Sequence, residues 1–379
     1  MELNMLSATS DIRARLATIS ILMLSGPVAC SGTGATIEVT APAGDSPEAV
    51  RTFLQSIVEQ RGAPPSISVA VAVGGQIVAA EAVGLADLSS ETPATSRTPY
   101  RSYSISKAMT AIAVLQLVDQ GKLHLGDDIR TSVPGFPGKR WPVTIGQLLA
   151  HTSGIRHYKK NAGEISSKTE YASLAESLVV FKDDPLEFEP GTAYRYTTFG
   201  FNLLTGAVEH ASGLAFGDYL QRNVFEPAGM ETSRLAEQGR DDSTGATGYQ
   251  PNNRRAKNLP NVSGRYGSSG VVTTPTDLVR LCAALDKGTL LVADAREKMF
   301  SVASPQLSEQ QALGWSVTRD EKDRRLVYAS GGGIGFTSLL FHYPDDGVTG
   351  ALMVNQAEFG ERVELLEALL GVYLDRGTD

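Results

Sequence analysis

Strand-like segments stand near both ends of the chain, with helical patterns between them. Residues 66–73 are rich in β-branched side chains, and Gly74 and Gly75 separate them from a second run of this kind at residues 76–80. This pattern predicts a β-hairpin. A helix is expected just before it, at residues 47–60.

The C-terminal part predicts three short buried strands, at residues 326–329, 336–342 and 348–354, and then a helix from about residue 358 to 373. Strands bury their apolar faces by pairing in a sheet, so both ends of the chain should share one. We expect an α/β (α+β) fold in which helices flank a central antiparallel β-sheet. A mostly helical sub-domain would be inserted at about residues 105–262.

The first thirty residues differ from the rest of the chain. Arg13 and Arg15 precede an apolar run at residues 16–24, which is too short to favour a retained transmembrane helix. The pattern predicts a signal peptide at residues 1–30. We therefore expect an exported bacterial protein, either periplasmic or held at the membrane as a lipoprotein.

The two cysteines have different expected roles. Cys30 follows a small residue at the end of the signal, so that lipidation of Cys30 and simple cleavage near Ala29 are alternatives. Cys282 has the helical spacing of an ordinary buried thiol. Residues 31–46 are typical of a linker, and the folded domain is expected over residues 47–375.

Charge and histidine spacing exclude several classes of function. Acidic residues outnumber basic ones by 42 to 34, and no basic stripe is present, which argues against a nucleic-acid partner. The five histidines show no metal-binding pattern, and no phosphate loop or dinucleotide fingerprint occurs. We expect no metal, no cofactor, and structural roles for the histidines.

Ser104 and Lys107 form the one Ser-x-x-Lys pattern of the chain, at the start of a predicted amphipathic helix that ends at Gly121. Residues three apart share a helix face, so the lysine amine can reach the serine hydroxyl. A desolvated lysine in that position acts as a base. Taken alone, so short a pattern also fits a serine that caps a helix beside a solvated lysine.

Two further segments offer groups that would complete a site. Tyr196 follows a turn and precedes another predicted amphipathic helix, which makes its phenol either a candidate proton shuttle or a packed aromatic ring. The glycines at positions 331–333 are expected to enter a strand, where backbone approaches a ligand closely and offers N–H groups to an oxyanion. A bulge or loop is the alternative for these glycines.

These segments, in this order, resemble the serine β-lactamase and penicillin-binding-protein superfamily over roughly residues 47–373. The resemblance is to its class C-like branch, with D-Ala-D-Ala carboxypeptidases and the mitochondrial β-lactamase-like serine peptidases. Ser104-x-x-Lys107 matches the first family motif. Tyr196-x-Thr198 stands where the family has Tyr-x-Asn, and Ser330-Gly331-Gly332 stands where it has Lys-Thr-Gly or His-x-Gly.

The resemblance implies a β-lactamase/transpeptidase-like fold and a serine hydrolase that forms a covalent acyl-enzyme on an amide or ester carbonyl. The substrate would be a small molecule, a peptide or an ester, and the activity that of a peptidase, an esterase or a β-lactamase. The implied catalytic residues are Ser104, Lys107 and Tyr196. The implied oxyanion and substrate contacts are Ser104, Gly333, Thr198, Ser330 and Gly332.

Two departures from the family pattern limit this prediction. Thr198 has a hydroxyl in place of an amide, and Ser330 removes the cation that would hold a substrate carboxylate. Both disfavour efficient turnover of β-lactams. A penicillin-binding-like sensor that binds or acylates without turnover is therefore the alternative function.

Overall fold

The computed structural model describes residues 37–159, 163–236, 245–257 and 259–375. The expected signal peptide, Cys30 and the first part of the expected linker, residues 31–36, lie outside the described residues. No helix in the described ranges is long and apolar enough to cross a membrane.

Strands and helices alternate along the chain as follows. The strands are β1 (Ser66–Val73), β2 (Gln76–Asp87), β3 (Thr92–Pro93), β4 (Tyr100–Arg101), β5 (Arg234–Leu235), β6 (Val271–Thr273), β7 (Ser316–Arg319), β8 (Arg325–Gly333), β9 (Phe336–Tyr343) and β10 (Val348–Val354). The longer helices are α2 (Pro47–Val58), α3 (Ser106–Asp119), α6 (Thr198–Ser212), α10 (Pro275–Asp286), α11 (Ala293–Met299) and α12 (Arg362–Leu374). The shorter ones are α4 (Ile145–Leu149), α5 (Leu174–Ser177), α7 (Phe216–Leu220), α8 (Glu226–Ala228), α9 (Tyr266–Ser269), η1 (Tyr103–Ile105), η2 (Ile129–Thr131), η3 (Leu178–Val180), η4 (Gln221–Phe225) and η5 (Ser263–Arg265).

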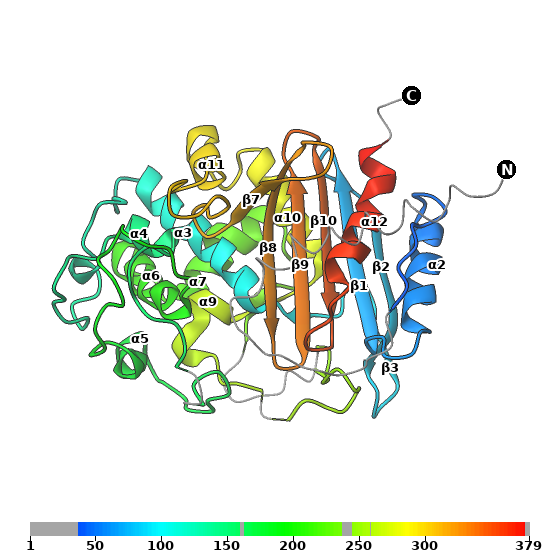
Figure 1. Ribbon diagram of the computed structural model, residues 1–379, viewed down its shortest axis with the longest axis horizontal. Helices are drawn as coiled ribbons and strands as arrows, with labels where there is room; N and C mark the ends of the chain where they lie inside the picture. The colour runs from blue at the N-terminus through cyan, green and yellow to red at the C-terminus, as the bar shows by residue number, and fades with distance from the viewer. Residues whose placement is uncertain (1–36, 160–162, 237–244, 258, 376–379) are drawn as a thin grey trace, which may run out of the picture. The chain divides into compact units, whose positions relative to one another are not determined.

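The large sheet joins the two ends of the described chain. Its strand order is β3-β2-β1-β10-β9-β8-β7, and its neighbouring strands run antiparallel. β1 pairs with β10 from Ile67 opposite Val354 to Val73 opposite Val348. Helices α2 and α12 cover one face and α10 the other, so β1, β9 and β10 are buried along almost their whole length (Figure 1). The predicted antiparallel sheet with flanking helices is confirmed.

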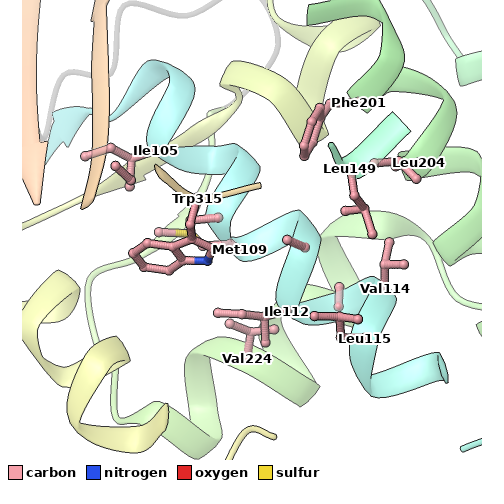
Figure 2. Close-up of a cluster of buried hydrophobic side chains, with 14 of the residues drawn as sticks. Ile105, Met109, Ile112, Val114, Leu115, Leu149, Phe201, Leu204, Val224 and Trp315 are labelled. Carbon is pink, nitrogen blue, oxygen red and sulfur yellow. The ribbon is translucent and has the colours of Figure 1, made fainter. Parts of the chain in front are cut away.

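Helix α3 runs through the middle of the helical region. All its residues from Ser106 to Leu115 are buried, so the prediction of an amphipathic helix is wrong. Neighbouring helices enclose it on every side, and its Met109 and Ile112 lie beside Trp315 and Val224 (Figure 2). Two polar residues at the start of the helix, Ser106 and Lys107, are buried together with the apolar ones.

Several element boundaries differ from the predictions. Helix α12 begins at Arg362 and not near residue 358, because Glu358 has a φ of 57°, which a right-handed helix does not allow. Residues 37–46 of the expected linker pack on the domain: Ile37 is buried, and Tyr373 donates a hydrogen bond of 2.7 Å to the carbonyl of Asp45.

The region between the outer strands also contains a small sheet. Strands β4, β6 and β5 pair in that order. Only β5 falls within the mostly helical insertion expected at about residues 105–262, and β4 and β6 flank it. The glycines at 331–333 end strand β8, where they had been expected to enter a strand. A two-residue turn then leads into β9.

The buried Asn355 side chain connects the strands that come from the two chain ends. It accepts hydrogen bonds from the Ser66 N–H and hydroxyl, both at 2.8 Å, and donates to the carbonyls of Leu85 and Ala86. Asn355→Ala should therefore lower the free energy of unfolding by about 3 kcal/mol, because it leaves buried polar groups unpaired. Urea unfolding measures the change, and the exposed control Asn252→Ala should shift stability by less than about 0.5 kcal/mol. Equal effects in the two variants would contradict this prediction.

Candidate active site

Ser104 lies in the tight turn η1, between β4 and α3. It precedes the first residue of α3 by two positions, and it is the one residue from Ser102 to Leu115 that is not buried. The preceding Tyr103 has a φ of 46°, a conformation that is costly for a residue with a side chain. Its hydroxyl donates a hydrogen bond of 2.7 Å to the Ile334 carbonyl, which attaches this turn to the end of β8.

Lys107 reaches Ser104 from the first turn of α3. Its Nζ lies 3.2 Å from the Ser104 Oγ and donates to the Ser268 carbonyl at 2.9 Å. The amine also lies 4.9 Å from the centre of the Tyr196 ring. No carboxylate pairs with it in the part of the chain that the structure describes, and burial lowers its pKa to about 7. A substantial fraction of the amine is therefore neutral at neutral pH, with a lone pair available to accept a proton.

Tyr196 contacts the same serine oxygen from the segment before α6. Its hydroxyl donates to the Ser104 Oγ at 2.8 Å. Burial raises the pKa of this phenol, so it stays protonated and acts as a donor. The structure thus brings the three predicted catalytic residues together around one oxygen atom.

Two histidines form the wall behind Tyr196. The ring centres of His151 and His157 lie 4.5 and 5.5 Å from that of Tyr196. Burial lowers the pKa of both imidazoles, that of His157 to about 4, and the charge of Lys107 lowers them further. Both rings are therefore neutral at neutral pH. The histidine side chains pack against the Tyr196 ring as uncharged groups.

The histidines also position the start of α6. The Nδ1 atoms of His151 and His157 accept hydrogen bonds from the N–H groups of Thr197 and Thr198, at 3.1 and 3.2 Å. The Thr197 hydroxyl accepts from the Gly200 N–H and donates to the Arg156 carbonyl. Sequence reasoning assigned the histidines structural roles without placing them at the site. Their distance from Tyr196 along the chain left no local signal.

Thr198, predicted to contact substrate, is buried at the first position of α6. Among the described residues, its side chain forms no hydrogen bond with Ser104, Lys107 or Tyr196. The backbone N–H of Thr198 donates a hydrogen bond of 3.2 Å to the His157 Nδ1. No group of three or more His, Cys, Asp or Glu side chains suited to a metal ion occurs in the described ranges.

The glycines of β8 allow this strand to lie directly against η1, the turn that carries Ser104. A Cβ atom at Gly331 would overlap the Ser102 carbonyl, and one at Gly333 would lie 2.6 Å from the Tyr103 ring. Because side chains alternate along a strand, Ser330 and Gly332 belong to the opposite face. Ser330 is half-buried and Gly332 is exposed.

The outer edge of β8 is open beside Ser104. Strand β7 pairs with β8 only as far as Tyr328, so residues 329–333 have β9 as their sole strand partner in the described part of the chain. This open edge ends where Gly333 approaches the turn that carries Ser104. The use of its backbone N–H groups for an oxyanion stays a prediction.

Comparison with known proteins places this geometry in a family. The model of the beta-lactamase family matches residues 54–373. The mitochondrial serine beta-lactamase-like protein LACTB of Bos taurus is 27% identical over an alignment of 398 positions, which covers 78% of this chain and 71% of the relative. Penicillin-binding protein 4* of Bacillus subtilis is 26% identical over 328 residues, covering 81% and 72%.

A solved structure shows the same fold. The D-stereospecific amidohydrolase from Streptomyces sp. superposes with a TM-score of 0.71 at 21% sequence identity, covering 85% of this chain and 98% of that one. The family match spans nearly the whole described domain and agrees with the resemblance expected from the three motifs. The chain therefore belongs to the beta-lactamase family and is a serine hydrolase of the acyl-enzyme type.

Proposed function

We propose that Ser104 is the nucleophile of this hydrolase, with Lys107 as its base and Tyr196 as its proton donor. The observation that carries the proposal is that the Lys107 amine and the Tyr196 hydroxyl both lie within hydrogen-bond distance of the Ser104 Oγ. Ser104 is also accessible within an otherwise buried segment. Together these features describe an activated nucleophile beside its base.

Acylation follows from the protonation states of these groups. The neutral Lys107 amine accepts the Ser104 proton as the Oγ forms a bond to the substrate carbonyl carbon. The carbonyl oxygen becomes an oxyanion, which N–H groups of Ser104 and Gly333 would stabilise. The bond to the leaving group then breaks, and Tyr196 donates its hydroxyl proton to the leaving group. Lys107 returns a proton to the Tyr196 oxygen. In the second half, a water oxygen bonds to the acyl carbon and gives one proton to Lys107. The bond between that carbon and the Ser104 Oγ then breaks, and the proton passes to the Oγ.

We propose esters and small peptide-like amides as substrates, in preference to β-lactams. Ser330 supplies no cation for a substrate carboxylate, and Thr198 does not reach the catalytic cluster by a hydrogen bond. The similarity to the amidohydrolase from Streptomyces sp. supports acyl transfer on an amide carbonyl. A sensor that acylates and does not turn over remains the alternative function.

Replacement of Ser104 tests the nucleophile. Ser104→Ala should abolish covalent labelling by a fluorophosphonate probe in intact-mass spectra. It should also lower kcat/KM for a short-chain ester by on the order of 10⁴-fold, as when a member of one catalytic unit is removed. The exposed control Ser301→Ala should keep both properties. Full labelling of Ser104→Ala would refute the assignment, while labelling of the parent without product release would favour the sensor.

The pH dependence tests the base. Lys107 accepts a proton only when neutral, so kcat/KM should fall about tenfold per pH unit below pH 7 and level off above it. Lys107→Arg should lose activity across the whole range because a guanidinium stays protonated. The exposed substitution Lys122→Arg is the matched control. A parent profile that is flat from pH 5 to 8 would exclude Lys107 as the base.

Substrate preference tests the role of position 330. We expect kcat/KM for 4-nitrophenyl acetate to exceed that for the β-lactam nitrocefin. Ser330→Lys should shift the ratio toward nitrocefin by about 10-fold. A lysine side chain is long enough to extend around the open edge of β8, and a charged hydrogen bond to the carboxylate is worth about 1.5–3 kcal/mol. Ser301→Lys adds the same charge at an exposed site as a control. Equal shifts in the two variants would contradict a specific role for position 330.

A further inference from the structure

A cavity of about 190 Å³ lies beside the catalytic cluster and has no part in the mechanism above. Three aromatic rings, those of Tyr158, Tyr171 and Phe199, line it together with Val180 and Arg265. Its size is comparable to the cavity of about 150 Å³ that holds a benzene molecule in an engineered protein. The cavity can therefore take a ring or a branched aliphatic group.

Arg265 is a buried cation without a carboxylate partner in this lining. Only 8% of its surface is exposed. Its guanidinium donates to neutral oxygens: to the Tyr158 hydroxyl at 2.8 Å and to the carbonyls of Ile165 and Asn261 at 3.2 Å. No acidic side chain pairs with it among the described residues. A charge removed from water in this way is ordinarily matched by an opposite charge.

The acidic residue of the cavity does not fill this role. Both carboxylate oxygens of Glu164 bind the guanidinium of Arg156 at 3.0 Å, and one of them also accepts the Lys159 N–H at 2.8 Å. Arg156 is further paired with Asp184 at 2.7 Å. Glu164 and Asp184 are thus committed to Arg156. Arg265 faces the Tyr158 ring at 5.5 Å and neutral oxygens, and no carboxylate pairs with it among the described residues.

Two chains of contacts connect Arg265 with the catalytic cluster. The Tyr158 ring lies 4.5 Å from the ring of His157, which packs against Tyr196. In the other direction, the Ser268 hydroxyl donates to the Arg265 carbonyl at 3.0 Å, and the Ser268 carbonyl accepts the Lys107 amine. One residue, Ser268, therefore stands between the cavity lining and Lys107, and two residues, His157 and Tyr196, stand between the lining and Ser104.

We propose that this cavity is a substrate subsite for a carboxylate carried on an aromatic or branched apolar group, with Arg265 as the counter-ion. The proposal deepens the proposed function and rests on it for the link to catalysis. It places the recognition of a substrate anion at Arg265, on a segment remote from position 330. The apolar lining provides the contacts for the group that carries the carboxylate.

Binding of a small aromatic acid tests the subsite independently of catalysis. Isothermal titration calorimetry with 4-methylbenzoate and the neutral 4-methylbenzamide should show at least about 10-fold tighter binding of the acid. Arg265→Gln should remove this preference, and Arg265→Lys should restore part of it. Arg61→Gln, which removes the same charge at an exposed position after α2, should retain it. Equal binding of acid and amide by the parent would overturn the proposal.

Hydrolysis tests the connection to the nucleophile. The substrates are the 4-nitrophenyl esters of (4-carboxyphenyl)acetic and (4-methylphenyl)acetic acid, whose para substituents cannot attack their own ester. The measured quantity is kcat/KM for the carboxylate-bearing ester divided by kcat/KM for the methyl ester. We expect Arg265→Gln to lower this ratio by about 10- to 100-fold, mainly because KM for the charged ester rises. Equal losses on both esters would show a structural role for Arg265 and overturn the proposal. Failure of the parent to hydrolyse either ester, with the acid still bound at Arg265, would count against the proposed function alone.

Discussion

The arrangement of the molecule depends on one unfavourable placement, the burial of the Lys107 amine beside Ser104. An amine in contact with water would keep its proton at neutral pH, whereas desolvation lowers its pKa to about 7. That desolvation requires α3 to be enclosed on all sides. The large core around Met109 and Ile112 provides the enclosure, and its apolar burial offsets the cost of the lysine (Figure 2).

The sheet supplies the second requirement, a rigid surface against which the turn carrying Ser104 is held. Pairing of β1 with β10 closes the sheet from both chain ends and leaves β8 beside the turn. Gly331 and Gly333 permit a contact that no side chain would allow, and the Tyr103 hydroxyl bonds to the strand end. The strained Tyr103 backbone is therefore held from two sides, which is how strain persists at functional sites.

The charged groups around the site fall into two sets, those of the cluster around Ser104 and those that pair with Arg156. The catalytic cluster itself contains no carboxylate, so the lysine is tuned by burial and not by an ion pair. Glu164 and Asp184 both pair with Arg156, and the Arg156 guanidinium donates a hydrogen bond to the His157 carbonyl, which holds that segment in place. In the proposed subsite, Arg265 would complete this pattern by receiving its counter-ion from the substrate, which links binding free energy to a charge already placed in the fold.

The sequence alone determined the central hairpin, the shared sheet and the identity of Ser104, Lys107 and Tyr196 as candidates, because these follow from local periodicity and from motifs in fixed order. It did not disclose that α3 is buried all round, since a helix inside a core shows little polar periodicity. It also left His151, His157 and Arg265 without a place at the site. Their positions arise from contacts between segments up to about a hundred residues apart, and only tertiary packing decides which distant residues meet and which charges lose water.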